Sequence, residues 1–232
     1  MPVNSELYHQ ISKELGVKNV TLVAVSKTKS VEEILELYQL GQRDFGENYV
    51  QELVEKYQQL PKDIRWHFIG HLQSNKVKLL APFIHLIHSV DSEKLLKEIN
   101  KEAKKNNRII DCLLQIYIAK EETKFGLDQE EAEELISRIS GTDSNDEKLF
   151  QNVRVKGLMG MASFTNDEEV VRKEFKGLKD LFDKWSALSL LPPAFSILST
   201  GMSADYEMAI EEGSNMVRIG SLLFGKREQK KQ

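Results

Sequence analysis

A lysine at the end of an apolar run is the residue of this chain best suited to covalent chemistry. Lys27 follows the run TLVAVS at residues 21–26, which is typical of a buried parallel strand. Side chains alternate faces along a strand, so Val23, Val25 and Lys27 are expected on one side, with the amine at the mouth of a sheet or barrel. Burial of a lysine disfavours the ammonium form and lowers its pKa, so the amine can form a Schiff base with an aldehyde or ketone. The alternative is a strand-ending lysine that reaches into solvent.

The elements around this lysine alternate between strand-like and helix-like patterns along the whole chain. The predicted strands cover residues 21–27, 43–46, 65–70, 84–90, 109–118, 153–161, 195–199 and 216–219. The segments between them carry apolar residues at helical spacing. Eight such units in one chain predict an α/β fold with a closed (β/α)8 TIM barrel rather than a doubly wound open sheet. We expect a single domain over residues 1–232, with Pro192 and Pro193 in an ordinary helix-to-strand connection.

Two polar segments are expected to lie away from any chemistry. Residues 141–148 are rich in turn-forming residues and join a helix to the next strand, which places them on the N-terminal face of a barrel. Residues 226–232 (KREQKKQ) have no apolar face and are predicted to form a frayed tail. Neither segment is expected to contribute to a site.

Composition narrows the classes of protein to which the chain can belong. Of its 232 residues, 41% are hydrophobic and 29% are charged, as in an ordinary globular protein, and its formal net charge of -4 gives no electrostatic reason to expect nucleic acid. The single cysteine, Cys112, lies in an apolar run and is interpreted as a small buried side chain. Without a membrane-spanning or secretory segment in the sequence, we expect a cytoplasmic monomer that binds no membrane.

The loops after the last two predicted strands are suited to holding a phosphate. Ser199, Thr200 and Gly201 follow strand seven, and Gly220 and Ser221 follow strand eight. Hydroxyl groups, permissive glycines and free N–H groups bind anions, and such barrels often hold phosphate at these two loops. Either loop alone could equally be an ordinary helix cap or tight turn, but the pair favours a shared phosphate ligand.

The chain resembles the pyridoxal phosphate homeostasis proteins, which are relatives of the barrel domain of alanine racemase. The motifs that carry the resemblance are VAVSKT at residues 23–28, GQRDFGENY at 41–49, WHFIGHLQSNK at 66–76, LSTGMSAD at 198–205 and VRIGS at 217–221. They extend over nearly the whole chain. The segment LMGMASF at residues 158–164 departs from the family pattern of small residues and proline, which concerns the shape of the pocket wall.

The resemblance implies a cofactor and the residues that hold it. Pyridoxal 5'-phosphate (PLP) would form a Schiff base with Lys27, and Arg218 would face its pyridine nitrogen. The phosphate would be surrounded by Ser199, Thr200, Gly201, Gly220 and Ser221. Asn48 and the adjacent Glu47 follow strand two and could reach the edge of the cofactor, although Asn48 could simply cap a helix. His71 could line the pocket.

Three functions remain open at this point. The first is a carrier that holds PLP and supplies it to apo-enzymes without turnover of its own. The second is a PLP-dependent racemase or lyase, which is disfavoured because an arginine at the ring nitrogen weakens the electron sink and because alanine racemase completes its site with a second domain. The third is a cofactor-free Schiff-base aldolase, against which the phosphate loops and Arg218 argue. The spacing of the histidines does not fit a zinc pair on one helix, and we predict no metal.

Overall fold

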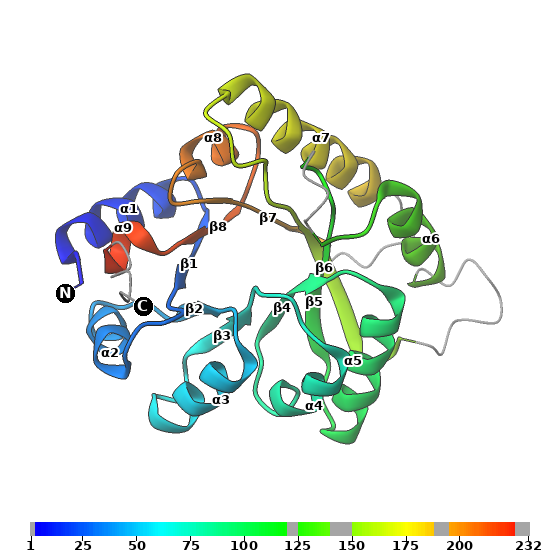
Figure 1. Cartoon of the computed structure of the whole chain (residues 1–232), viewed down its shortest axis with the longest axis horizontal. Helices are drawn as coiled ribbons and strands as arrows, with labels where there is room; N and C mark the ends of the chain where they lie inside the picture. Colours follow the sequence, from blue (N-terminus) through cyan, green and yellow to red (C-terminus); the bar gives the residue numbers. More distant parts are fainter. Residues whose placement is uncertain (1–2, 120–124, 140–149, 188–194, 226–232) are drawn as a thin grey trace, which may run out of the picture.

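Eight parallel strands form the centre of the molecule. The structure, a computed structural model, describes residues 3–119, 125–139, 150–187 and 195–225. The strands pair in sequence order and the last closes on the first (Figure 1). They are β1 (Thr21–Val25), β2 (Asp44–Glu47), β3 (Arg65–Phe68), β4 (Leu86–Val90), β5 (Ile110–Gln115), β6 (Val153–Met159), β7 (Ile197–Met202) and β8 (Met216–Ile219). The predicted (β/α)8 barrel is confirmed.

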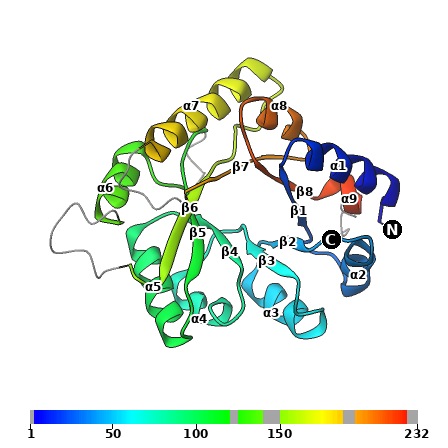
Figure 2. The ribbon, with the colours of Figure 1, turned by 180° about the vertical axis from the view of Figure 1, so that it is seen from behind.

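Helices surround the barrel on its outer face (Figures 1 and 2). They are α1 (Ser5–Val17), α2 (Val31–Gln39), α3 (Val50–Gln59), the 3-10 turn η1 (Ser74–Lys76), α4 (Val77–Leu80), α5 (Glu93–Lys105), α6 (Gln129–Ile139), α7 (Glu168–Ser186), α8 (Tyr206–Glu211) and α9 (Ser221–Phe224). No described helix is both long and apolar enough to cross a membrane.

The helix boundaries follow from local sequence signals. Ser30 caps α2 through a capping box with Glu33, which satisfies two backbone N–H groups at the helix start. The chain leaves the same helix at Gly41, whose φ of +106° suits glycine better than any residue with a Cβ atom. These signals fix the direction in which each helix returns to the next strand.

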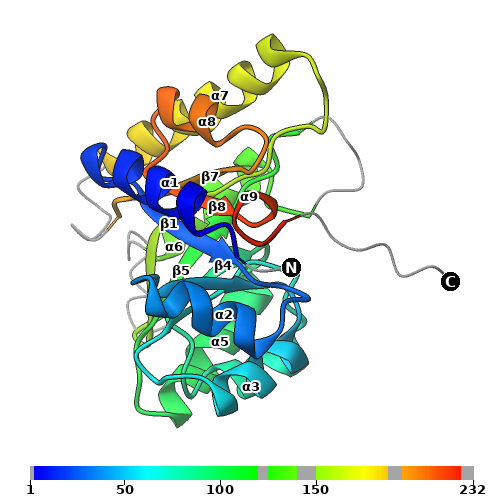
Figure 3. The same ribbon diagram turned by 90° about the vertical axis from the view of Figure 1, so that its left-hand side faces the viewer.

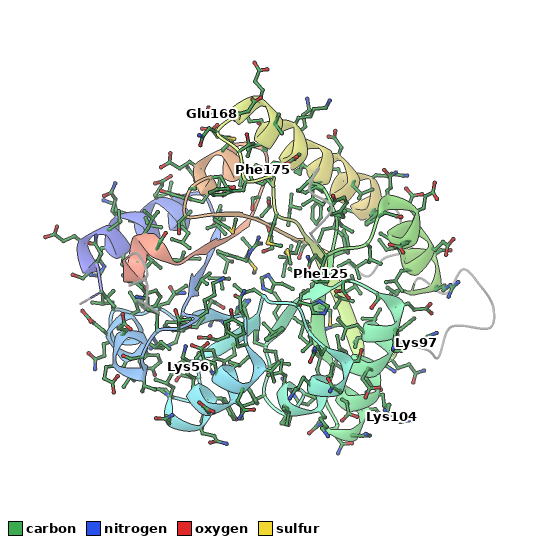
Figure 4. All side chains as sticks on the ribbon, in the orientation of Figure 1. Lys56, Lys97, Lys104, Phe125, Glu168 and Phe175 are labelled. Atoms are coloured by element: carbon green, nitrogen blue, oxygen red, sulfur yellow. The ribbon has the colours of Figure 1, made fainter. Side chains whose placement is uncertain are left out.

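Three hydrophobic clusters stabilise the described part of the fold, and the smallest lies around Phe175 of α7 and Ala209 of α8. The largest lies between the barrel and its helices and includes the fully buried Trp66 of β3 and Leu178 of α7. A smaller core inside the barrel contains Val23, Leu113 and Met159. Figure 4 shows side chains filling the space enclosed by the strands, so the interior of the barrel is packed.

Three local predictions differ from the structure. The first strand ends at Val25, so Lys27 lies in the turn that follows it. Strand seven runs on to Met202 and includes the predicted loop residues 199–201. The helix α9 was not predicted; it lies beside α1, where the N–H of Asn4 donates to the carbonyl of Leu223 at 2.9 Å (Figure 3). Residues 141–148, Pro192, Pro193 and the tail 226–232 lie outside the described residues.

Candidate functional site

A cavity of about 300 Å³ opens at the C-terminal end of the barrel. It lies over the ends of β1, β2, β7 and β8, where a barrel of this kind carries its functional groups. The described residues that line it are Val25, Lys27, Lys29, Asn48, Ile69, Met161, Met202, Ser203, Ala204, Arg218, Gly220, Ser221 and Gly225. The wall is therefore partly apolar and carries three cationic side chains.

Lys27 reaches the cavity from a constrained turn. The polypeptide changes direction at Thr28, whose φ of +66° is unusual for a β-branched residue. The N–H of Thr28 donates to the carboxylate Oε1 of Glu52 at 2.6 Å. Anchoring from α3 thus compensates a strained backbone directly after the lysine.

A buried ion pair supports this turn from behind. Glu47 at the end of β2 is fully buried and accepts hydrogen bonds from the Ser26 hydroxyl at 2.6 Å and from Lys56 Nζ at 2.7 Å. Lys56 also donates to the Ser26 carbonyl at 2.7 Å and to Glu52 at 2.7 Å. Burial raises the pKa of Glu47 to about 7, although its contacts with Lys56 and Ser26 favour the carboxylate. Glu47 therefore holds the Lys27 turn and does not line the cavity.

Lys29 is the second lysine at the cavity, and its ammonium group is already engaged. Its Nζ donates to Glu33 at 3.2 Å and to the carbonyl of Phe224 at 2.9 Å, and it lies over the Phe224 ring. These contacts tie Lys29 to α2 and α9. Both lysines line the cavity, and Lys27 does so from the turn after β1.

Arg218 of β8 forms the floor of the cavity and is 4% exposed. Its guanidinium donates to the Ser199 carbonyl at 2.9 Å, the Ser199 hydroxyl at 2.7 Å and the Gly160 carbonyl at 3.0 Å. Burial lowers its pKa to about 10, so it stays cationic at neutral pH. Within the described part of the chain no carboxylate forms an ion pair with it. A buried cation held only by neutral acceptors suits a ligand with an acceptor atom or negative charge.

The loops after β7 and β8 form one anion-binding wall. The N–H of Gly220 donates to the Ser203 hydroxyl at 3.1 Å and so ties the two loops together. Across residues 3–119, 125–139, 150–187 and 195–225, the N–H groups of Ser203, Ala204 and Ser221 find no acceptor. Backbone N–H groups at helix starts are suited to a phosphate. The wall therefore supplies the donors that a phosphate ester requires.

The predicted site residues divide into two groups. Lys27, Asn48, Arg218, Gly220 and Ser221 come together at the cavity. The side-chain Oδ1 of Asn48 is buried without a hydrogen-bond partner among the described residues, which fits an atom that meets a ligand. The backbone of Asn48 passes close to Gly70. A Cβ atom on residue 70 would lie 2.3 Å from the Asn48 carbonyl oxygen. Asn48 is thus held in place by its main chain.

The other predicted phosphate ligands lie below the wall. Ser199 and Thr200 are buried in β7, and neither they nor Gly201 line the cavity. The extension of β7 to Met202 moves the loop by three residues, so Ser203 and Ala204 take the position expected for them. The motif LSTGMSAD includes Ser203 and Ala204, but the sequence does not show at which of its residues the strand ends. His71 does not line the cavity; it contacts Asp91 at 3.1 Å and stacks on Phe125, which Figure 4 labels.

Histidines from β3 and β4 meet inside the barrel, which their spacing in the sequence did not reveal. Potential ligand atoms of Asp44, His67 and His85 lie within 4.8 Å of one another. The Asp44 carboxylate is, however, already held by Arg65 and by His67 Nε2 at 3.0 Å. These groups satisfy one another without an ion, and the absence of a metal remains a prediction.

Comparison with known proteins agrees with this geometry. The family model described as alanine racemase, N-terminal domain, matches residues 6–228. The pyridoxal phosphate homeostasis protein of Aquifex aeolicus is 43% identical over 214 residues, which cover 92% of this chain and 90% of that protein. Its human counterpart is 39% identical over 229 residues, covering 94% of this chain and 81% of that protein.

A solved structure extends the comparison to three dimensions. PipY of Synechococcus elongatus with PLP bound superposes with a TM-score of 0.83 at 31% identity, covering 95% of this chain and 99% of that chain. Fold, sequence and cavity residues point in the same direction. The chain belongs to the pyridoxal phosphate homeostasis proteins, a family built on the alanine racemase N-terminal domain.

Proposed function

We propose that this protein binds PLP in the cavity at the C-terminal end of the barrel and takes part in the homeostasis and supply of this cofactor. One observation carries the proposal: a single cavity joins the amine of Lys27, the guanidinium of Arg218 and the anion-binding wall around Ser203 and Ser221. These groups match the aldehyde, the ring nitrogen and the phosphate of PLP. The PLP-bound structure of PipY, a relative at 31% identity, supports the same assignment.

Each group has a separate task in holding the cofactor. Lys27 would attach covalently through a Schiff base, because it lines the same cavity as Arg218 and the anion-binding wall. Arg218 would donate a hydrogen bond to the ring nitrogen, and Asn48 would contact the ring edge. The N–H groups of the wall would bind the phosphate. PLP supplies an electrophilic carbonyl that exchanges between amines.

The lining of the cavity favours a carrier over a racemase or lyase. A racemase needs a second acid or base on the face opposite the lysine, since one base reaches only one face of the substrate. Apart from lysine and arginine, the described lining residues contribute no titratable side chain. Arg218, with a pKa of about 10, donates to a ring nitrogen without protonating it, and this weakens the ring as an electron sink.

α-Proton exchange separates carrier from catalyst. The PLP-loaded protein is incubated in deuterated water with alanine, serine and other common amino acids, alongside free PLP at the same concentration. A carrier gives exchange no faster than free PLP. Exchange at about 1 per second or faster that disappears in Lys27→Ala would establish a racemase or lyase instead. A colourless protein that takes up no PLP would contradict both functions and reopen the aldolase alternative.

We further propose that the protein acts as a cytoplasmic monomer that passes PLP to apo-enzymes. Transfer is measured by mixing the loaded protein with an apo-aminotransferase in the presence of a phosphatase that destroys free PLP. Recovery of aminotransferase activity that resists the phosphatase supports direct transfer, and recovery abolished by it contradicts direct transfer. Light scattering during size-exclusion chromatography reads the oligomeric state in the same sample.

A further inference from the structure

A line of four hydrogen bonds runs through the interior of the barrel and ends at the cavity floor. Asp44 Oδ1 lies 3.0 Å from His67 Nε2, and His67 Nδ1 lies 2.9 Å from His88 Nε2. His88 Nδ1 lies 3.2 Å from the Ser199 hydroxyl, to which Arg218 Nη1 donates at 2.7 Å. Five residues from five strands, β2, β3, β4, β7 and β8, therefore form one connected chain, called here the interior chain.

The centre of the interior chain is buried from solvent. His88 and Ser199 are 0% exposed and His67 is 1% exposed. The side chains that share the barrel interior with them are apolar, among them Leu113 and Met159. Buried polar groups in such surroundings are costly unless each one is hydrogen-bonded. The interior chain thus satisfies the hydrogen-bonding groups that its members bury.

The two ends of the interior chain fix its direction. Arg218 can only donate hydrogen bonds, and the Asp44 carboxylate can only accept them. Burial alone would raise the pKa of Asp44, but hydrogen bonds from Arg65 and His67 hold it well below its usual range. Arg65 donates from Nε and Nη2 to the same carboxylate, so Asp44 accepts from two groups of Arg65 and from His67.

Neutral imidazoles allow one arrangement of protons. His67 must donate from Nε2 to Asp44, which leaves its Nδ1 as the acceptor. His88, whose pKa burial holds well below its usual value, then donates from Nε2 to His67 and accepts at Nδ1 from the Ser199 hydroxyl. Ser199 in turn accepts from Arg218. Every donor points from the cavity towards Asp44.

We propose that Asp44, His67 and His88 are positioning residues of the cofactor site, which fix the Ser199 hydroxyl and the Arg218 guanidinium through this one-directional chain. The proposal rests on the proposed function, since Arg218 is taken to meet the ring nitrogen of PLP. Its consequence is that Asp44, at the start of β2 and outside the cavity lining, influences a cofactor that it does not touch.

The first test reads the protons directly and needs no cofactor. Nitrogen-15 spectra of the histidine-labelled protein separate the two neutral tautomers and the imidazolium, and His67→Phe and His88→Phe assign the signals. Both histidines are expected as neutral Nε2–H tautomers. An Nδ1–H tautomer or an imidazolium at either position at neutral pH would overturn the proposal.

The second test measures how a change at Asp44 affects PLP binding at the other end of the interior chain. In Asp44→Asn the carboxylate that anchors the chain is lost. The matched control is Asp111→Asn on β5, because Asp111 also pairs with an arginine, Arg154, but forms no hydrogen bond with a histidine among the described residues. PLP affinity in Asp44→Asn should fall by about threefold to tenfold with a changed absorption band of the bound cofactor, whereas Asp111→Asn should match the wild type.

His88→Phe removes the centre of the chain and should weaken PLP binding by about tenfold or more. Met159→Leu, a volume-conserving change in the same interior, serves as its control. Unchanged affinity and absorption in both Asp44→Asn and His88→Phe, with folded proteins, would overturn the proposal. A wild-type protein that takes up no PLP would refute the proposed function, while the tautomer measurement would still decide whether the directional chain exists.

Discussion

Two buried cations of this barrel are held in opposite ways. Lys56 lies between α3 and the barrel (labelled in Figure 4), and its ammonium is matched by Glu47 and Glu52 and by the Ser26 carbonyl. Arg218, at the cavity floor, meets only the hydroxyl and carbonyls described above. A buried cation that pairs with carboxylates of the protein stabilises the fold. A buried cation that contacts only neutral acceptors can still pair with a negatively charged ligand. The same substitution at the two positions should therefore have opposite effects.

The largest effect on stability is expected from Lys56→Met. The change leaves Glu47 buried without its counter-ion, which should lower the free energy of unfolding by about 3 kcal/mol. Urea denaturation measures the loss. Lys184→Met is the control, because both partners of its pair with Glu133 are exposed, and such a pair should contribute little to stability. Equal losses in the two variants would contradict the structural role of Lys56.

Arg218→Met should affect binding and spare the fold. Removing hydrogen bonds to a charged donor should weaken PLP binding by about a hundredfold, measured by titration of the cofactor absorption. The free energy of unfolding without PLP should fall less than in Lys56→Met, because removal of a buried charge offsets the hydrogen bonds lost by its neutral acceptors and no buried carboxylate loses its partner. A loss of stability as large as that of Lys56→Met, with PLP affinity unchanged, would reverse the comparison.

The pH dependence of stability sharpens the role of Glu47. Burial raises its pKa from 4.5 to about 7 in the folded protein, so the native state binds more protons than the unfolded state between these values. The stability that the raised pKa of Glu47 contributes is fully present below pH 4.5. It is lost as the pH rises through about 7, at no more than about 1.4 kcal/mol per pH unit.

Glu47→Gln removes that titration. Relative to this variant, the wild type should lose stability as the pH rises from about 5 to about 8, which urea denaturation at several pH values would reveal. Parallel stability curves for the two proteins would show that Glu47 keeps an ordinary pKa. Arg218, with a pKa of about 10, should contribute no change over the same range.

The smallest effect concerns the strained turn after Lys27. Thr28 has a φ of +66°, a conformation that asparagine adopts more readily than a β-branched residue. Thr28→Asn should raise the free energy of unfolding by about 0.5 to 1 kcal/mol and leave PLP affinity unchanged. A destabilised variant would show that the threonine side chain contributes contacts beyond its backbone.

The barrel could be predicted from the sequence because each element carries its own periodic signal. The ends of elements were harder to place. Strand β1 stops at Val25 because the chain turns at once: the Ser26 carbonyl accepts from the N–H of Lys29 and from Lys56 Nζ of α3. Strand β7 continues to Met202, so Ser199, Thr200 and Gly201, which were expected after the strand, lie within it.

The cavity residues could be predicted where they belong to a sequence motif, as Lys27 and Arg218 do. The buried pair of Glu47 and Lys56 was not, because two charged residues nine positions apart are most often exposed. The meeting of His67 with His88 was missed for another reason. It depends on the register of β3 against β4, in which His67 pairs with Leu86, and register is a tertiary property.

The most direct test of the central claim is chemical fixation of the cofactor. The protein is loaded with PLP, reduced with borohydride, digested and examined by mass spectrometry, with Lys27→Ala treated in parallel. The account predicts a phosphopyridoxyl group on Lys27, its absence from the variant, and weaker non-covalent PLP binding that persists in the variant. An adduct on Lys29 or Lys76, or no adduct at a defined lysine in the wild type, would contradict the claim that Lys27 holds the cofactor.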